Sequence, residues 1–292
     1  MNKNVSQTFE QMIEWQSQKK CIRNGIVVYG APSARKFRYL RDSLKRFSET
    51  VLCRDFETLT FTDIDSGFLQ RYVSHLQGRN VAEKIRKLKQ IFRSAHAGTE
   101  VFDPVEAIPA VRKTTDLFIP YSEIVRIREM DRISLTNKES FCLDLFLFGF
   151  YSGGSSVAEM AALRKENVHG DYLCCERTGC SGTARIPLNK YAKAILRKYR
   201  KDGFGDYLLP VFTHKHLSAE QQQGRIKRIT EQTNGLMKEI ARKLQLECEL
   251  TLGMTRRIFI EHMLACRMPL ETIAEVTGCT LDTIIRYLEK HK

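Results

Sequence analysis

The feature that most constrains this chain is a stretch that is apolar on every side, residues 140–151 (SFCLDLFLFGFY). Its large side chains do not keep to one face, as they do in a helix at the surface of a globular protein. A helix of this kind is stable in water only when other elements cover it all round. The stretch therefore predicts a buried central helix inside a helical body, with its core formed by Phe141, Leu143, Leu145, Phe146, Phe148 and Phe150.

The segments that follow this helix predict a mostly helical domain with one small sheet. Residues 171–177 and 184–188 are rich in strand-forming residues and flank the turn signal TGCSGT, so they indicate an antiparallel hairpin. Helices with a minor antiparallel sheet belong to the mainly α (α+β) class. Helical spacing of apolar residues is found near residues 121–130, 155–168, 189–203 and 223–246.

The last forty residues predict three further short helices. The breaks between them fall at residues 267–269, which end in a proline, and at residues 278–280, which begin with a glycine. Such short pieces are stable only when their apolar faces pack together. Those faces comprise Ile258, Phe259, Met263 and Leu264, then Ile273, Ala274 and Val276, then Ile284, Ile285 and Leu288.

The N-terminal part predicts four amphipathic helices, over residues 6–20, 34–52, 63–78 and 80–97. We expect Ser6 or Thr8 to cap the first, Asp63 to begin the third and Gly78 to end it. We also expect Val51 to face the core at the end of the second helix. Residues 24–34 interrupt the pattern with two glycines and a proline.

A segment without sustained periodicity separates the two helical parts. Residues 101–117 contain two prolines and read as a linker. The chain of 292 residues is long enough for two domains with cores of their own. We therefore expect domains over residues 1–100 and 118–292.

The charge of the chain favours a polyanionic partner. The net charge is +13, and it divides into +7 over residues 1–112 (19 basic minus 12 acidic) and +6 over residues 113–292 (28 minus 22). Two N-terminal helices carry dense rows of Lys and Arg beside an apolar face, which suits contact with phosphates. A solvated cationic surface is the alternative. The candidate DNA-binding residues there are Arg35, Lys36, Arg38, Lys84, Arg86, Lys87, Lys89 and Arg93.

Several classes of protein are excluded by composition. No run of eighteen uncharged apolar residues is present, and the N-terminus has no apolar signal core, so we expect a cytoplasmic protein without membrane contact. Nine cysteines without a regular framework indicate a reducing compartment. Cys174, Cys175 and Cys180 lack paired zinc-ligand spacing, so we expect no metal and no other cofactor.

The C-terminal motifs resemble those of the tyrosine recombinase (phage integrase) family, in particular its bacterial integrases and DNA invertases. That family ends with H-x-x-R-H, an apolar helix, L-G-H and a tyrosine about nine residues on. This chain has Gly253, Arg257 and Cys279 at the three histidine positions, and it is one residue short between Gly278 and Tyr287. The motif residues that it keeps are Arg256, Phe259, His262, Leu264, Pro269, Gly278 and Tyr287.

The resemblance implies a fold and a chemistry. It implies an N-terminal four-helix core-binding (SAM-like) domain and a mostly helical catalytic domain, which close around a DNA duplex. In the family a tyrosine attacks a phosphodiester and forms a 3′-phosphotyrosyl link. Two arginines bind the non-bridging oxygens, a hairpin lysine protonates the leaving 5′-oxygen, and histidines assist the proton transfer. No cofactor takes part.

Position by position, the resemblance implies a degenerate site. The motif of the first arginine has Ser156 in place of arginine, although its acidic partner Glu159 is kept; the K-T-G motif reads Arg177-Thr178-Gly179. Arginine binds phosphate but releases a proton poorly. Arg256 corresponds to the second arginine and Tyr287 to the nucleophile. The groups of three positions are lost, at Ser156, Gly253 and Cys279.

These losses favour a DNA-binding protein in recombination or integration whose strand-transfer activity is weak or lost. Each lost transition-state donor lowers the rate by about 10²–10³. Compensation by Arg164, Arg257 or Arg286 stays open. Such a protein would act on double-stranded DNA as a homo-oligomer or beside an active recombinase. Arg257 is a further candidate DNA contact.

Two other hypotheses remain. One is an active site-specific recombinase that uses Tyr287; the bland alternative for this residue is an interface tyrosine on a terminal helix. The other is a transcription factor with a helix-turn-helix over residues 270–289, in which Thr280, Asp282 and Arg286 would contact bases.

Overall fold

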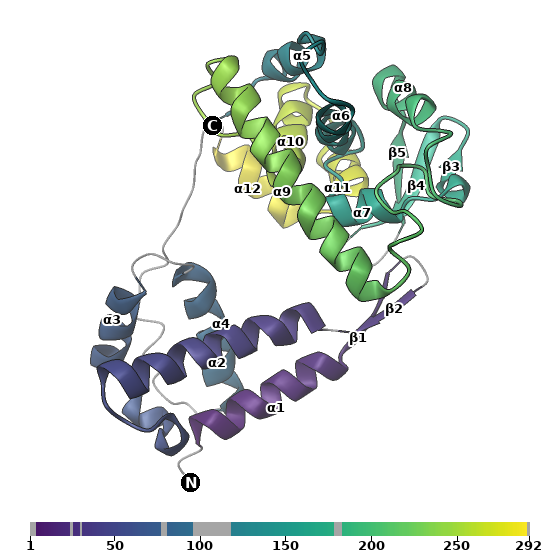
Figure 1. The fold of residues 1–292 in the computed structure, drawn as a ribbon. Helices are drawn as coiled ribbons and strands as arrows, with labels where there is room; N and C mark the ends of the chain where they lie inside the picture. Colours follow the sequence, from purple (N-terminus) through teal and green to yellow (C-terminus); the bar gives the residue numbers. More distant parts are fainter. Residues whose placement is uncertain are drawn as a thin grey trace. The chain divides into compact units, whose positions relative to one another are not determined.

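The computed structural model describes residues 4–23, 26–29, 31–76, 81–95, 118–177 and 183–290 (Figure 1). The chain forms two compact units, Met1–Thr114 and Thr115–Lys292. The expected linker, residues 101–117, lies outside the described residues. Within the part described, none of the helices combines the length and the hydropathy that crossing a bilayer requires.

The first unit is a group of four helices around a single core. Phe37, Leu40, Leu44 and Phe47 line the inner face of the second helix and are at most 1% exposed, as their spacing predicts. Val51 at the end of that helix is 41% exposed, so its expected burial is wrong. The helices are α1 (Val5–Gln18), α2 (Ala31–Val51), α3 (Ser66–His75) and α4 (Val81–Ala95), with short 3-10 turns at Phe56–Thr58 and Phe61–Asp63.

The caps of these helices differ from the expected ones. Asn4 caps α1, because its side-chain oxygen accepts a hydrogen bond from the amide of Gln7 at 3.1 Å. Ser6 and Thr8 lie inside the helix. Helix α3 begins at Ser66, and its cap is Asp65, which accepts from the amide of Phe68 at 2.7 Å. The expected stop of α3, Gly78, lies outside the described residues.

Strands β1 (Lys20–Arg23) and β2 (Ile26–Tyr29) pair antiparallel between α1 and α2, with Lys20 opposite Tyr29. The glycines and the proline of this stretch predict a break in the helical pattern, and no strand was expected here. Its signal was the β-branched run IVV directly after the Asn-Gly dipeptide at 24–25, which is the most favourable two-residue turn for a hairpin. The pair is an addition to the expected fold.

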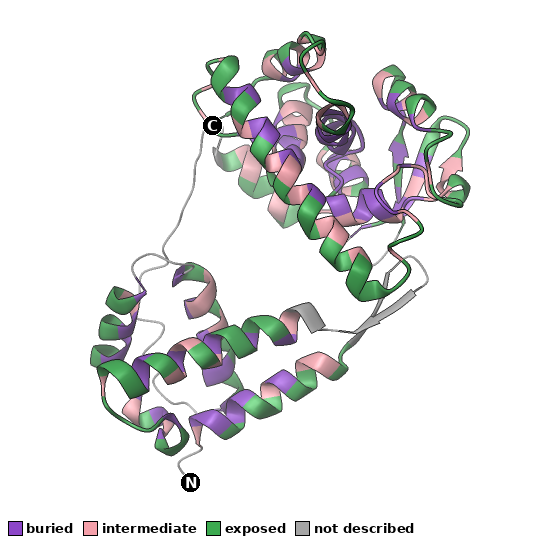
Figure 2. Ribbon diagram, in the orientation of Figure 1, coloured by how far each residue is buried: buried purple, intermediate pink, exposed green. Residues whose placement is uncertain are grey.

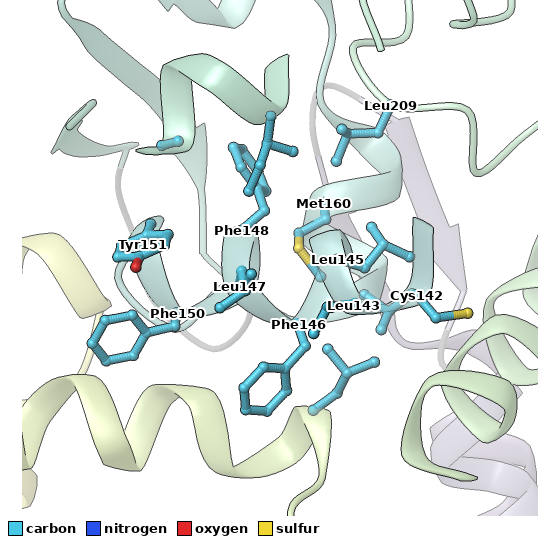
Figure 3. Packing of buried hydrophobic residues seen from close by; sticks show 14 of the residues in the cluster. Cys142, Leu143, Leu145, Phe146, Leu147, Phe148, Phe150, Tyr151, Met160 and Leu209 are labelled. Atoms are coloured by element: carbon cyan, nitrogen blue, oxygen red, sulfur yellow. The ribbon is translucent and has the colours of Figure 1, made fainter. Parts of the chain in front are cut away.

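The second unit is built around α6, as the apolar stretch predicts. Every residue from Phe141 to Tyr151 is buried, and Figure 2 shows this helix in the buried colour along most of its length. Helices α7, α8, α9 and α10 pack against it. Figure 3 shows its labelled side chains leaving the helix in several directions, with Met160 and Leu209 beside them. The helices are α5 (Tyr121–Glu129), α6 (Asn137–Tyr151), α7 (Val157–Ala162), α8 (Lys190–Lys198), α9 (Ala219–Lys243), α10 (Thr255–Ala265), α11 (Leu270–Thr277) and α12 (Leu281–Lys290).

One carboxylate lies inside the apolar helix α6 and is paired on both oxygens. Asp144 is 2% exposed. Its Oδ1 is 2.6 Å from Arg132 Nη1, and its Oδ2 is 2.6 Å from Lys198 Nζ and accepts from the Tyr199 hydroxyl at 2.8 Å. A buried charge needs such partners. This network holds α8 and the segment before α6 against the central helix.

The sheet of the second unit has three antiparallel strands in the order β3-β4-β5. Strands β4 (Tyr172–Glu176) and β5 (Thr183–Pro187) form the expected hairpin, with Cys174 opposite Arg185. Strand β3 (Val168–His169) was not expected, because two residues carry no periodicity. Together these elements confirm the prediction of a mainly helical chain with a small antiparallel sheet.

Helices α10, α11 and α12 share a small core of their own, which we call the C-terminal cluster. Its buried centre is Ile260, Ile273 and Ile284, one residue from each helix. Two details differ from the expected faces: Ile260 was not assigned to the core, and Ile285, assigned to it, is 39% exposed. Partly buried residues around the centre are Met263, Leu264, Leu270, Ala274, Cys279 and Tyr287.

Candidate functional site

The turn between α6 and α7 carries two glycines that the local geometry requires. Gly153 and Gly154 have φ values of +70° and +75°, in the left-handed region that favours glycine. A methyl group on Gly154 would overlap the Cα and Cβ of Arg256, and one on Gly153 would lie 2.7 Å from Val276 Cγ1. Because both residues lack a side chain, α10 and α11 approach this turn at main-chain distance.

Ser156 begins α7 as its N-cap. Its hydroxyl accepts a hydrogen bond from the amide of Glu159 at 3.2 Å, and the carboxylate of Glu159 accepts from the amide of Ser156 at 2.7 Å. This reciprocal pair is a capping box. The residue at the family's first arginine position is therefore exposed and serves the helix, while Glu159 is held in a fixed orientation with its side chain 4% exposed.

Arg256 pairs with Glu159 from the first turn of α10. Its Nη2 donates to both carboxylate oxygens, at 2.8 Å and 3.2 Å, and its Nε donates to the carbonyl of Gly154 at 2.9 Å. The remaining nitrogen, Nη1, has no hydrogen-bond partner among the described residues, and the side chain is 27% exposed. Arg256 is thus oriented by two acceptors and keeps donor groups for a ligand.

Arg177, by contrast, points into the protein. Its side chain is 0% exposed, and its guanidinium donates to buried oxygens of the α6–α7 turn and of α11. Burial lowers its pKa from the ordinary value. This placement does not fit the expected binding of phosphate, and Thr178 and Gly179 lie outside the described residues. The acceptors are Ser155 Oγ at 2.7 Å, Ser152 O at 2.6 Å, Gly153 O at 3.3 Å, Val276 O at 2.8 Å and Glu159 Oε2 at 3.5 Å.

The two remaining substituted positions lack the imidazole that the family has there. Gly253 is exposed in the 3-10 turn Leu252–Met254, and a methyl group there would have only Thr251 Oγ1 near it, at 3.9 Å. Cys279 is partly buried against the C-terminal cluster. The reading of Cys279 as a small apolar packing residue agrees with this contact.

Tyr287 is partly buried and packs against the centre of the C-terminal cluster. Helix α12 presents Ile284 and Tyr287 to that cluster, three residues apart, on the same side of the helix. Arg256 lies on α10 and is directed to Glu159. Tyr287 therefore packs against the C-terminal cluster, whereas Arg256 pairs with Glu159.

The arginines considered as substitutes lie in different surroundings. Arg164 stacks over the ring of Tyr207 at 4.9 Å, and Arg286 is exposed and donates to the carbonyl of Asp282 in its own helix at 3.1 Å. Arg257 Nε pairs with Glu261, which is buried in α10, at 2.6 Å. Each of these three arginines has a local partner.

His262, a kept motif residue, stacks on the ring of Tyr121 at 4.2 Å with an interplanar angle of 10°. Burial lowers the pKa of this imidazole from its ordinary value. Among the described residues no group of three or more His, Cys, Asp or Glu could hold a metal ion.

In the first unit, the facing sides of α2 and α4 bring cations together in a cluster that we call the basic face. It comprises Lys36, Arg46, Lys84, Arg86 and Lys87. Burial, and then repulsion from Arg46, lowers the pKa of Lys84. Burial, and then repulsion from Arg86 and Lys36, lowers the pKa of Lys87. These like charges are held close together by the packing of two helices.

The basic face also has fixed geometry. Lys84 Nζ donates to Ser43 Oγ at 2.7 Å, and Lys87 Nζ lies 4.5 Å from the centre of the Phe37 ring. Glu83 pairs with Lys36 at 2.6 Å and with Arg86 at 3.8 Å. Sequence analysis had left Arg46 out of the binding set. Of the other predicted residues, Arg35, Arg38 and Arg93 are exposed on the same two helices, and Lys89 is partly exposed.

Other cations of α2 are neutralised locally. Arg41 pairs with Glu10 and Asp42, and Lys45 pairs with Glu49 and Glu57. The sequence shows the same density of Lys and Arg all along this helix. In the fold Arg41 and Lys45 each have two acidic partners, whereas Lys36 and Arg86 of the basic face share one, Glu83.

Comparison with known proteins was informative at the level of structure. No protein-family model and no curated protein sequence matches the chain. The Tn1549 transposon integrase, solved with transposon right end DNA, is similar with a TM-score of 0.65 and 13% identity over 98% of this chain and 94% of that one. A lambda integrase dimer bound to a COC' core site gives 0.61 and 13%, over 98% and 95%.

A third similar structure is a lambda integrase tetramer bound to a Holliday junction, with a TM-score of 0.56 and 14% identity over 94% of this chain and 76% of that one. The likeness extends over nearly the whole chain, and it agrees with the order of helices and hairpin described above. The resemblance read from the motifs is confirmed at the level of the fold: this chain has the fold of the tyrosine recombinases and integrases.

Proposed function

We propose that the protein binds double-stranded DNA and acts in DNA recombination or integration, with a strand-transfer activity that is weak or lost. The observation that carries this proposal is the state of the site around Glu159. Arg256 is oriented there with donors free for a phosphate, whereas Ser156, Gly253 and Cys279 lack the groups that assist the reaction, and Arg177 is buried.

Phosphate binding is favoured by both units. A guanidinium held by a carboxylate and a carbonyl presents its remaining N–H groups in a fixed direction, which suits a phosphate oxygen. In the first unit the basic face concentrates positive charge along two helices. The integrases named above, which share this fold, were solved on DNA, and this supports the same ligand. We further propose a cytoplasmic protein that acts as a homo-oligomer or together with an active recombinase.

DNA binding can be tested through its salt dependence. A fluorescein-labelled 30-bp duplex of arbitrary sequence should bind the full chain, and the affinity should fall steeply with salt. Each phosphate contact that is lost reduces the log–log slope by about 0.9. We expect Arg46→Gln/Lys84→Gln, which removes two cations of the basic face that have no acidic partner among the described residues, to reduce the slope by about 2. The matched control is Lys45→Gln, whose cation is balanced by Glu49 and Glu57. Equal effects of both variants would contradict the assignment of the basic face.

Strand transfer is tested on nicked duplexes, which trap a covalent intermediate because the cleaved fragment diffuses away. We expect no adduct with wild-type protein on a pool of nicked duplexes of randomised sequence. An adduct on denaturing gels that disappears in Tyr287→Phe would establish the alternative, an active recombinase that uses Tyr287. An adduct that persists in that variant would point to a different nucleophile.

A second candidate function is sequence-specific binding through a helix-turn-helix. The observation that favours it is the C-terminal cluster, which gives α10, α11 and α12 a common core, with Gly278 in the left-handed conformation between α11 and α12. Thr280, Asp282 and Arg286 are exposed on this unit. Selection of binding sites from random duplexes decides between the two. A consensus that changes in Arg286→Ala supports the helix-turn-helix, and a consensus indifferent to it favours the recombinase-like mode.

A further inference from the structure

The side chain of Arg177 makes several hydrogen bonds in the second unit, and it lies where no phosphate can reach it. The guanidinium of Arg177 makes hydrogen bonds with the α6–α7 turn, with Glu159 and with the carbonyl of Val276, 99 residues away in sequence. Among the residues that the structure describes, its Nε has no hydrogen-bond partner. A charged group held in this way at 0% exposure needs a reason beyond packing, because burial of a charge is costly unless it is compensated.

That reason lies in the carboxylate of Glu159. Two guanidiniums share its Oε2, Arg256 at 2.8 Å and Arg177 at 3.5 Å, and the carboxylate is 4% exposed. The three charges sum to +1 (two arginines minus one glutamate). Without Arg177 the sum of the charges of Arg256 and Glu159 is zero.

We propose that Arg177 is a positioning residue, the second counter-cation of Glu159. It offsets the negative charge of that carboxylate, so that an incoming phosphate is attracted by the positive charge of Arg256. This inference rests on the proposed function, because it assigns the phosphate to Arg256. A phosphate that approaches Arg256 also meets the field of Glu159, and at short range a bare carboxylate opposes it strongly. Arg177 cancels that field from inside the protein.

Arg177 also supplies the positive charge next to Glu159 that the serine at position 156 cannot provide. Ser156 offers a hydroxyl to the helix cap and no charge to Glu159. Arg177, from the end of β4, reaches the same carboxylate from the other side of the turn. The positive charge next to Glu159 is therefore supplied from a different element of the chain, and it is supplied at a buried place where it cannot bind the ligand directly.

A purely mechanical role for Arg177 is the competing explanation. Its bond to Val276 fixes the last turn of α11 against the α6–α7 turn, and loss of that bond would shift the C-terminal helices. The two roles predict different outcomes when residue 177 keeps its charge but loses its hydrogen bonds. They also differ when the charges of Arg177 and Glu159 are removed together. Four variants of the full chain separate them.

The variants are Arg177→Met, Arg177→Lys, Glu159→Gln and the double variant Arg177→Met/Glu159→Gln. Glutamine at 159 can still accept from the amide of Ser156, so the capping box of α7 is retained. Arg132→Met is the matched control, because it breaks an ion pair with another buried carboxylate, Asp144, in a separate network. Binding of the 30-bp duplex is measured by fluorescence anisotropy at several salt concentrations, and unfolding is measured in urea.

The summed charge of residues 159, 177 and 256 predicts the order of DNA affinity among the variants. This sum is +1 in wild type, 0 in Arg177→Met, +1 in the double variant, +1 in Arg177→Lys and +2 in Glu159→Gln. We expect Arg177→Met to bind about tenfold more weakly than wild type. The double variant and Arg177→Lys should bind within about twofold of wild type, and Glu159→Gln should bind more tightly. Arg132→Met should lower stability without changing affinity.

Specific outcomes would overturn the proposal. If Arg177→Lys loses as much affinity as Arg177→Met, or if the double variant does not recover, the role of Arg177 is mechanical. If Arg177→Met does not fold, Glu159→Gln and Arg177→Lys decide, because an unchanged or weaker affinity of Glu159→Gln contradicts the charge argument by itself.

Failure of the proposed function would look different. In that case Arg256→Ala leaves the affinity and the salt slope unchanged, which shows that Arg256 does not contact DNA. The pairing of Arg177 with Glu159 is then judged by unfolding: a double-variant cycle in urea should show coupling between positions 177 and 159. Absence of coupling would remove the counter-cation role as well.

Discussion

At the scale of single residues, Gly154 sets the distance between two parts of the candidate site. Its main chain touches that of Arg256, and its carbonyl accepts from Arg256 Nε at 2.9 Å. A side chain at this position would push α10 away from the turn, and with it the arginine that reaches Glu159.

We predict that Gly154→Ala destabilises the second unit by about 2–5 kcal/mol, because overlap with α10 adds to the strain of a left-handed alanine. The control is Gly205→Ala, where φ is +58° and no atom lies within 4 Å of the added methyl group, so strain alone should cost about 1–2 kcal/mol. Urea unfolding measures both. Equal losses would show that the close approach to Arg256 carries no energetic weight.

A second prediction concerns Asp63 in the first unit. The hydroxyl of Thr60 at 2.6 Å, its amide at 2.9 Å and Arg54 at 2.8 Å lower the pKa of this carboxyl from 3.8 to about 2. Because the folded pKa is the lower one, the stabilisation is present above pH 4 and is lost as the pH falls to about 2.

The side chain of Asp63 is 25% exposed, and the shift corresponds to about 2 kcal/mol after allowance for screening. We expect wild type to exceed Asp63→Asn by this amount at pH 6, measured by urea unfolding, and the difference to disappear near pH 2. A difference that stays constant with pH would show that the loss comes from packing and not from the charge.

At the scale of elements, the structure shows what a sequence can and cannot predict. Helices with one apolar stripe, such as α2 and α4, and the fully apolar α6 were predicted because burial follows directly from spacing. The predictions that were wrong concern residues near the ends of helices. Val51 and Ile285 keep helical spacing, but no neighbour covers them, and Asn4 caps α1 although the apolar pattern starts later.

The candidate site was predictable in its parts and not in their arrangement. The motifs identify Glu159 and Arg256 separately, because each lies in a recognisable segment, but they do not predict that the two side chains pair. The burial of Arg177 depends on the carbonyl of Val276, on a helix near the other end of the chain. No local pattern in the sequence records that proximity. The same holds for Arg46, whose place in the basic face depends on the packing of α4 against α2.

Helix α12 offers an element-scale test with a built-in control. Ile284 is 0% exposed in the C-terminal cluster, and its neighbour Ile285 is 39% exposed. We expect Ile284→Ala to cost about 2–5 kcal/mol and Ile285→Ala about 0.5 kcal/mol. Hydrogen exchange should show faster opening of α10, α11 and α12 in the first variant. Exchange that is unchanged in these helices would mean that the cluster does not hold them together.

At the scale of the whole molecule, each of the two units has a core of its own. The first is built on Phe9, Phe37, Phe47 and Tyr72, and the second on the residues around α6. The sequence also divides the positive charge almost equally, +7 and +6. These features lead us to expect two bodies that each fold alone.

We predict that a fragment of residues 118–292 folds by itself, and that its free energy of unfolding agrees within about 1 kcal/mol with that of the same unit in the full chain. A fragment of residues 1–100 should fold as well and bind the duplex more weakly than the full chain. Circular dichroism and urea unfolding check the first statement, and anisotropy checks the second. An unfolded fragment would show that one unit depends on the other.

The contact between Gly154 and Arg256 has a consequence for evolvability. Because peptide groups set this spacing, it does not depend on which side chains stand at positions 156, 253 and 279. A laboratory selection for DNA cleavage would start from a backbone already in position and would need to replace functional groups alone.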